Sequence, residues 1–146
     1  EDGMVAGQIL DLQGEKRPLN ETELREVHAH KTGDLIRAAC QMGAVLGSGS
    51  EPQIQAAGEY GMALGMAFQI RDDMLDEIGS RRQLGKPVGS DSANGKSTFV
   101  TIHGIKECQR LVEQETGKAI AELEQGGFVA TEFLKNLSEL LTSRTH

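Results

Sequence analysis

The sequence lacks the features that mark nucleic-acid-binding, membrane-spanning and disulfide-stabilised proteins. Acidic residues outnumber Lys and Arg by 22 to 15, which gives a formal net charge of −7 at pH 7. Because no basic patch with interleaved aromatic residues occurs either, nucleic acid is not an expected partner. No apolar run is long enough for a membrane span, and the N-terminus has no basic-then-apolar signal pattern. Cys40 and Cys108 lack metal-ligand spacing, so we expect two reduced thiols in a cytoplasmic protein.

Segments with the alternating apolar and polar residues of a β-strand are also missing, so the sequence predicts an all-α fold. Apolar residues recur every three or four positions instead, and the length suits one domain or a piece of a larger one. The chain opens inside a helical pattern without an initiator Met or an N-cap, which indicates a fragment of a longer polypeptide. The expected helices cover residues 1–12, 20–30, 34–46, 52–78, 98–103, 105–124 and 131–143.

Three details of this pattern can be tested against a structure. Asn20, with Glu23 three residues on, is a capping-box start for the second helix. The segment Lys31-Thr32-Gly33 interrupts the helical periodicity, and a break between two helices, with the glycine in an unusual backbone conformation, is its simplest interpretation. The spacing of apolar residues over 34–46 then predicts a buried helix. His28 and His30 are two positions apart and face different ways, so solvated or helix-end roles suit them better than a shared metal.

The predicted 52–78 helix contains three aspartates within a stretch of five residues. Asp72 and Asp76 are four positions apart, and Asp73 and Asp76 are three apart, so all three can point at one place. Like charges at that spacing repel unless a cation lies between them, and Mg²⁺ suits a site of oxygen ligands that substrate phosphates complete. The pattern alone is also compatible with a solvated acidic face. The apolar, small-residue-rich sequence before the aspartates favours a central helix and therefore the metal site.

A long loop over residues 79–97 follows this helix. It is rich in Gly and Ser and carries Lys86 and Lys96. Loops of this length inside a compact helical chain are usually functional or disordered. Lysines and backbone N–H groups close in sequence to an acidic metal site are what a bound diphosphate needs. The segment from Gly89 to Ser97 comes near the spacing of a P-loop, but no strand precedes it, so we interpret the match as chance.

Taken together, these segments resemble the C-terminal half of a trans-isoprenyl (polyprenyl) diphosphate synthase, and the resemblance covers essentially all of residues 1–146. The most similar branch is that of the bacterial farnesyl diphosphate synthases, or geranyltranstransferases. Four blocks in one order make the resemblance specific. They are Gly3-Met4-Val5-Ala6-Gly7-Gln8 with Asp11, His30-Lys31-Thr32-Gly33, Phe68-Gln69-Ile70-Arg71-Asp72-Asp73-Met74-Leu75-Asp76, and Leu84-Gly85-Lys86-Pro87-Val88-Gly89-Ser90-Asp91 followed by Gly95-Lys96-Ser97-Thr98.

The resemblance implies a helical bundle around a deep cavity, here only its C-terminal half as one all-helical domain, and usually a homodimer. It implies a prenyltransferase that condenses an allylic diphosphate with isopentenyl diphosphate after Mg²⁺-assisted ionisation, with farnesyl diphosphate as product. By resemblance, the residues divide into three groups. The aspartates of the second Asp-rich motif, Asp72, Asp73 and Asp76, hold Mg²⁺. Three lysines, Lys31, Lys86 and Lys96, bind the diphosphate. The side-chain oxygens of Thr32 and Gln69 stabilise the allylic cation, and Lys31 also counts as catalytic.

This chain also departs from the family. The first Asp-rich motif, its adjacent arginine pair and the isopentenyl diphosphate site are absent, so the chain is expected to be inactive alone. Phe99-Val100 replaces an expected Tyr-Pro, and Arg144 is a candidate for a basic tail that closes over substrate. A geranyl or geranylgeranyl diphosphate synthase, a non-catalytic synthase-like subunit and a helical interaction module with a solvated acidic face remain as alternatives.

Overall fold

The computed structural model describes residues 3–84 and 97–144, with no side-chain description for residues 80–84, and over these ranges it is helical without a strand. The all-α prediction is therefore confirmed for the described chain. The elements are α1 (Met4–Gly14), α2 (Glu21–His28), η1 (Ala29–Gly33), α3 (Asp34–Leu46), α4 (Glu51–Leu84), α5 (Phe99–His103), α6 (Ile105–Gln125) and α7 (Glu132–Ser143).

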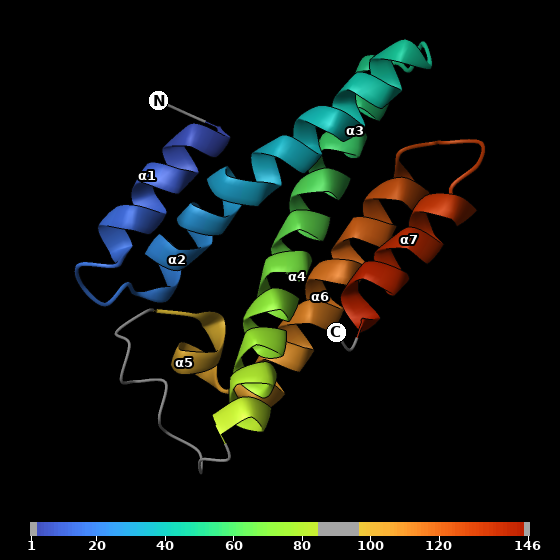
Figure 1. The fold of residues 1–146 in the computed structure, drawn as a ribbon. Helices are drawn as coiled ribbons and strands as arrows, with labels where there is room; N and C mark the ends of the chain where they lie inside the picture. The colour runs from blue at the N-terminus through green and yellow to red at the C-terminus, as the bar shows by residue number, and fades with distance from the viewer. Residues whose placement is uncertain (1–2, 85–96, 145–146) are drawn as a thin grey trace.

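The 34-residue helix α4 is the centre of the fold, with α3 packed along one part of it and α6 along another (Figure 1). The N-terminal pair α1 and α2 lies at one side of α4, and α7 lies at the other side, against α6. Buried residues form two apolar clusters along α4. One joins α2, α4, α5 and α6 around Ile70 and Phe99, and the other joins α4 and α6 around Tyr60 and Leu123.

Local sequence signals account for several helix boundaries. At the start of α2, the Asn20 side chain accepts a hydrogen bond from the Glu23 N–H, and the Glu23 carboxylate accepts one from the Asn20 N–H, both at 3.0 Å. The predicted capping box is thus confirmed. Thr98 and Thr101 form the same arrangement at the start of α5. Gly104, with φ of 77°, ends α5 and allows the turn into α6, because that backbone conformation strains residues with a side chain.

The predicted break at Lys31-Thr32-Gly33 is wrong. These residues belong to the π-helical turn η1, which joins α2 to α3 without an interruption. Gly33 has φ of −57° and ψ of −49°, which is ordinary helical geometry and not the unusual conformation expected of a break. A π-helical turn inserts an extra residue into a continuous helix and shifts the faces on either side, which explains why the apolar periodicity is lost there.

The burial predicted for residues 34–46 is also wrong. Across α3, all of which the structure describes, none of the residues is buried, although the helix packs against α4 with one face. Its apolar side chains Leu35, Met42 and Leu46 are 60%, 63% and 85% exposed. The periodicity correctly identified a helix with an apolar face, but it could not show which neighbour, if any, covers that face.

Two further expectations from composition can be compared with the described chain. None of its helices has the length and apolar character that a membrane crossing requires. Cys40 and Cys108, both in this part of the molecule, are free thiols; Cys108 is buried and Cys40 is half-buried.

Candidate functional site

The acidic motif, Asp72, Asp73 and Asp76, lies in the second half of α4. The apolar stripe of this helix is buried, and Asp72 and Asp76 point away from it. Ala67 and Ile70 are completely buried and Met74 nearly so, which fixes the rotation of α4 against α5 and α6. Asp72 keeps 37% of its side chain exposed, and Asp76 is exposed. Because positions four apart share a helix face, these two carboxylates lie one turn apart on the open side of α4.

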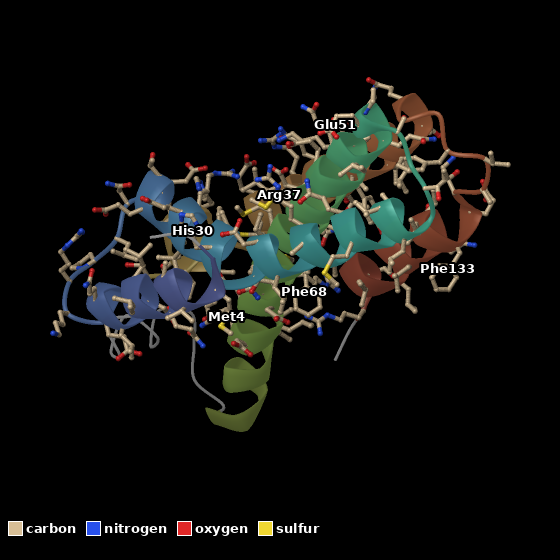
Figure 2. The ribbon with its side chains drawn as sticks, turned by 90° about the horizontal axis from the view of Figure 1, so that it is seen from above. Met4, His30, Arg37, Glu51, Phe68 and Phe133 are labelled. Atoms are coloured by element: carbon tan, nitrogen blue, oxygen red, sulfur yellow. The ribbon has the colours of Figure 1, made fainter. Side chains whose placement is uncertain are left out.

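Asp72 has partners on both carboxylate oxygens. Gln69, three residues earlier on α4, donates from its amide to Oδ2 at 3.3 Å. The guanidinium of Arg144, which directly follows α7, binds Oδ1 and lies over the Phe68 ring at 4.2 Å from its centroid. Seen from above (Figure 2), Phe68 lies on α4 in the middle of the molecule, with α1 and α7 on opposite sides. The end of the chain thus comes to the acidic motif.

A second contact holds the end of the chain in place. Arg71 donates to the backbone carbonyl of Arg144 from Nε at 2.9 Å and from Nη2, and its Nη1 donates to Gln109 at 3.2 Å. Sequence reasoning missed this role of Arg71. The partners are 73 residues apart, and no local pattern signals such a pair.

The electrostatics of Asp72 favour a cation. Burial raises the pKa of Asp72 above its usual value, Arg144 opposes that rise, and the like charges of Asp76 and Asp73 add to it. A carboxylate whose charged form is disfavoured by burial and by neighbouring carboxylates is stabilised by any positive charge that reaches it. Arg144 supplies part of this charge in the structure, and a divalent cation would supply more.

Asp73 faces a different environment. Its Oδ2 accepts a hydrogen bond from the Phe99 N–H at 2.8 Å, and the His28 Nε2 lies 3.7 Å from the same oxygen. Burial is the main cause that raises the pKa of the Cys108 thiol to about 11, and the charge of Asp73 adds to it. Asp73 therefore lies towards α2, α5 and α6. Of the two roles expected for His28, the solvated one is wrong, since only 8% of the residue is exposed. His28 is the last residue of α2, where a helix-end role remains open to it.

Lys31 is positioned by α1. Its Nζ binds Asp11 Oδ2 at 2.7 Å, which pairs residues from two of the four blocks that carry the family resemblance. Gly7 makes this pairing possible, because a Cβ there would lie 2.2 Å from the backbone nitrogen of Lys31. Gly7 thus lets the backbone of η1 approach α1 closely.

The turn that carries Lys31 and Thr32 packs directly against α4. A Cβ on Gly65 would lie 2.9 Å from the Gly33 Cα, so two glycines bring η1 and α4 into backbone contact. Gln69 follows Gly65 by one helical turn and Asp72 by two. The structure therefore brings the Lys31–Thr32 segment, Gln69 and the acidic motif to neighbouring turns of the same helix pair. Lys86 and Lys96 lie outside the described residues.

The donor set matches a magnesium site that a ligand completes. Within residues 3–84 and 97–144, no three His, Cys, Asp or Glu side chains are grouped closely enough to hold a metal ion by themselves. Asp72 and Asp76 nevertheless offer carboxylate oxygens on one face of α4, and Mg²⁺ is commonly held by one or two carboxylates together with waters and substrate phosphates. The residues present fit that kind of site and not an all-protein cage.

Comparisons with known proteins show the family of this chain. The family model for polyprenyl synthetase matches residues 2–130. The chain therefore belongs to the polyprenyl synthetase family. A farnesyl diphosphate synthase from Micrococcus luteus is 43% identical over 114 residues, which cover 78% of this chain and 39% of that protein. Geranylgeranyl pyrophosphate synthase 4 from Arabidopsis thaliana is 34% identical over 147 residues, or 99% of this chain and 40% of that protein.

A solved structure shows the same arrangement of helices. The geranyltransferase of Helicobacter pylori, complexed with magnesium and isoprenyl diphosphate, superposes with a TM-score of 0.74 at 29% identity, over 97% of this chain and 46% of that one. The chain thus spans less than half the length of these members of the family. The family and the helical fold inferred from the sequence are both confirmed, whereas the roles of individual site residues stay predictions.

Proposed function

We propose that this chain supplies the second Asp-rich, diphosphate-binding part of a trans-prenyl diphosphate synthase that condenses an allylic diphosphate with isopentenyl diphosphate. The observation that carries the proposal is the meeting of two elements on α4: the carboxylates of Asp72 and Asp76, and the Lys31–Thr32 segment that packs against Gly65. A metal–diphosphate group needs both anionic oxygen ligands and a cationic donor, and this junction offers both.

Each side chain would then have a distinct task. Asp72 and Asp76 hold Mg²⁺, which withdraws charge from the leaving diphosphate when it is bound. Lys31, held by Asp11 in the structure, turns to the diphosphate oxygens as a point charge. Gln69 donates its amide to Asp72, which leaves the carbonyl oxygen on the side away from that carboxylate, where it and the Thr32 hydroxyl can stabilise positive charge on the allylic carbon.

The proposed condensation needs no reagent other than the two diphosphate substrates. The bond between the allylic carbon and the diphosphate oxygen breaks, and its electron pair leaves with the diphosphate. The double bond of isopentenyl diphosphate then attacks the allylic carbon, and transfer of a proton from the adduct to an oxygen of the released diphosphate restores a double bond. Such a cation survives only where water is excluded and fixed dipoles face it.

The preferred product is farnesyl diphosphate, and a homodimeric, cytoplasmic enzyme is part of the same proposal. Its support is the similarity to a bacterial farnesyl diphosphate synthase. Geranylgeranyl pyrophosphate synthases also match, at lower identity, so geranylgeranyl diphosphate is the second candidate product. The preferred allylic substrate is dimethylallyl or geranyl diphosphate.

The test is release of diphosphate from geranyl diphosphate plus isopentenyl diphosphate, with Mg²⁺ and with a chelator. It is run on this chain and on the full open reading frame that encodes it. We expect a C15 product from the longer protein only with Mg²⁺, and none from this chain by itself. If the longer protein is folded but releases no diphosphate and forms no product, a non-catalytic subunit that pairs with an active partner is favoured instead.

A further inference from the structure

The neighbouring aspartates Asp72 and Asp73 have different surroundings. Successive residues on an α-helix project about 100° apart, so adjacent side chains can meet different neighbours. Asp72 contacts Gln69 and Arg144 and keeps 37% of its side chain exposed. The Asp73 side chain is 14% exposed and accepts the Phe99 N–H at 2.8 Å.

The acceptor that Asp73 provides lies in a junction of three helices. Phe99 is the first residue of α5 and is completely buried. The His28 ring from α2 stacks on the Phe99 ring at 5.5 Å between centroids, and the guanidinium of Arg25, also from α2, lies 5.3 Å from the same centroid. Asp73, on α4, therefore reaches the point where α2 and α5 meet.

The hydrogen bond at this junction supplies an acceptor for a backbone N–H at the start of α5. The first N–H groups of a helix have no acceptor within the helix, and a buried N–H without a partner costs the full desolvation of that group. Asp73 satisfies the Phe99 N–H with a charged oxygen, which makes the stronger kind of hydrogen bond. His28 does not compete with the Phe99 N–H for Asp73 Oδ2, because its Nε2 lies 3.7 Å from that oxygen, beyond hydrogen-bonding distance.

We infer that Asp73 is a positioning residue that fixes α4 against α5 and α2, and that Asp72 and Asp76 alone supply the carboxylates for a metal–diphosphate ligand. Asp73 Oδ2 already accepts the Phe99 N–H and only 14% of the Asp73 side chain is exposed, so Asp73 is less open to a metal than Asp72 and Asp76 are. With Asp73 turned inward, the rotation of α4 places Asp72 and Asp76 outward. The ligand part of this inference rests on the proposed function, whereas the structural part does not.

The experiment compares four variants of the full 146-residue chain. Asp73→Ala removes the acceptor, while Asp73→Asn removes the charge but keeps an amide oxygen that can accept the Phe99 N–H. Asp76→Asn is the matched control, because it makes the same change of charge at an exposed position of the same helix. Thermal unfolding is measured for each, together with calorimetric binding of inorganic diphosphate at saturating Mg²⁺, with Asp72→Asn as a reference for loss of a ligand.

We expect Asp73→Ala to lower the unfolding temperature by about 5–10 °C, as loss of a charged hydrogen bond in a chain of this size should. Asp73→Asn should restore most of that loss, and Asp76→Asn should unfold no earlier than the unchanged chain. Binding of magnesium diphosphate by Asp73→Asn should stay within about twofold of the unchanged chain, whereas Asp72→Asn should lose tenfold or more. Failure of Asp73→Ala to fold, with Asp73→Asn folded, gives the same answer.

Two results would overturn the inference. One is an unfolding temperature for Asp73→Ala equal to that of the unchanged chain. The other is a loss of magnesium diphosphate affinity in Asp73→Asn as large as in Asp72→Asn. If the unchanged chain binds no magnesium diphosphate, the proposed function fails for this chain by itself, and the unfolding temperatures still decide the role of Asp73.

Discussion

At the scale of single residues, the acidic motif is built from carboxylates that are adjacent in sequence and differ in surroundings. Asp72 is balanced by the guanidinium of Arg144, while Asp73 accepts a backbone N–H. Half-exposed ion pairs contribute little to stability, about 0–1 kcal/mol. The Arg144–Asp72 pair therefore matters more for the occupancy of Asp72 than for folding, since a cation that binds Asp72 must share it with Arg144 or displace the guanidinium.

The first prediction concerns this competition. Arg144→Gln should tighten Mg²⁺ binding in the presence of diphosphate by about two- to fivefold, because the change removes a positive charge worth up to about 1 kcal/mol at Asp72. Isothermal titration measures the affinity. Arg110→Gln is the control, because its guanidinium pairs with the exposed Glu107 on α6 and should leave the affinity unchanged. Weaker binding in Arg144→Gln would mean that the guanidinium helps to hold the ligand.

The second prediction concerns the buried thiol of Cys108. Its pKa is raised to about 11 from an ordinary 9.0, mainly by burial. A raised pKa in the folded state gives stability that is complete below pH 9 and is lost as the pH rises towards 11, because the unfolded chain releases the proton first. Urea unfolding at pH 8 and pH 10.5 should show a fall in the free energy of unfolding that is smaller in Cys108→Ala by about 1–2 kcal/mol. An equal fall in both chains would contradict this account.

At the scale of elements, three close approaches assemble the candidate site. α1 touches η1 at Gly7, η1 touches α4 at the pair Gly33 and Gly65, and α5 touches α4 through Asp73. Glycine at the first two contacts lets backbones approach to distances that no Cβ would allow. The position of Lys31 beside α4 is therefore set by residues without side chains, and a single added methyl group should disturb it.

The third prediction tests the contact between α1 and η1. Gly7→Ala places a Cβ 2.2 Å from the Lys31 backbone nitrogen, so α1 must move away. We expect the free energy of unfolding to fall by about 2–4 kcal/mol, at the upper end of the cost of overpacked core substitutions.

Gly117→Ala in α6 is the matched control, because a Cβ there meets nothing within 4 Å. It should stabilise the chain by about 0.5–1 kcal/mol, since alanine is the better helix former. Chemical unfolding of both variants gives the values. A Gly7→Ala chain as stable as the unchanged one would show that α1 does not pack on η1 as described.

How much of this was readable from the sequence depends on the range of the interactions involved. The capping box at Asn20, the helical periodicity of α4 and the shared face of Asp72 and Asp76 depend on residues within four positions, and all three were predicted. The contacts of Arg144 with Asp72 and of Asp73 with Phe99 join residues 72 and 26 positions apart. No periodicity encodes such pairs, so the inward turn of Asp73 was missed.

At the scale of the whole molecule, the described chain combines a buried core with several exposed apolar residues. The buried clusters lie where α4 meets α2, α5 and α6. By contrast, α1 and α3 expose several large apolar side chains, among them Val5 at 67% and Leu46 at 85%. Contiguous exposed apolar faces mark surfaces that contact another protein segment, a partner or a ligand. The candidate site lies where α1, η1 and α4 come together.

The most direct test of the account is calorimetric binding of geranyl diphosphate to this chain, with Mg²⁺ and with a chelator, in the unchanged chain and in Asp72→Ala. The account predicts binding that requires Mg²⁺ and that falls at least tenfold in Asp72→Ala, because the carboxylate that holds the metal is gone. Binding of equal strength in the chelator, or in Asp72→Ala, would contradict the assignment of this face of α4 as a metal–diphosphate site.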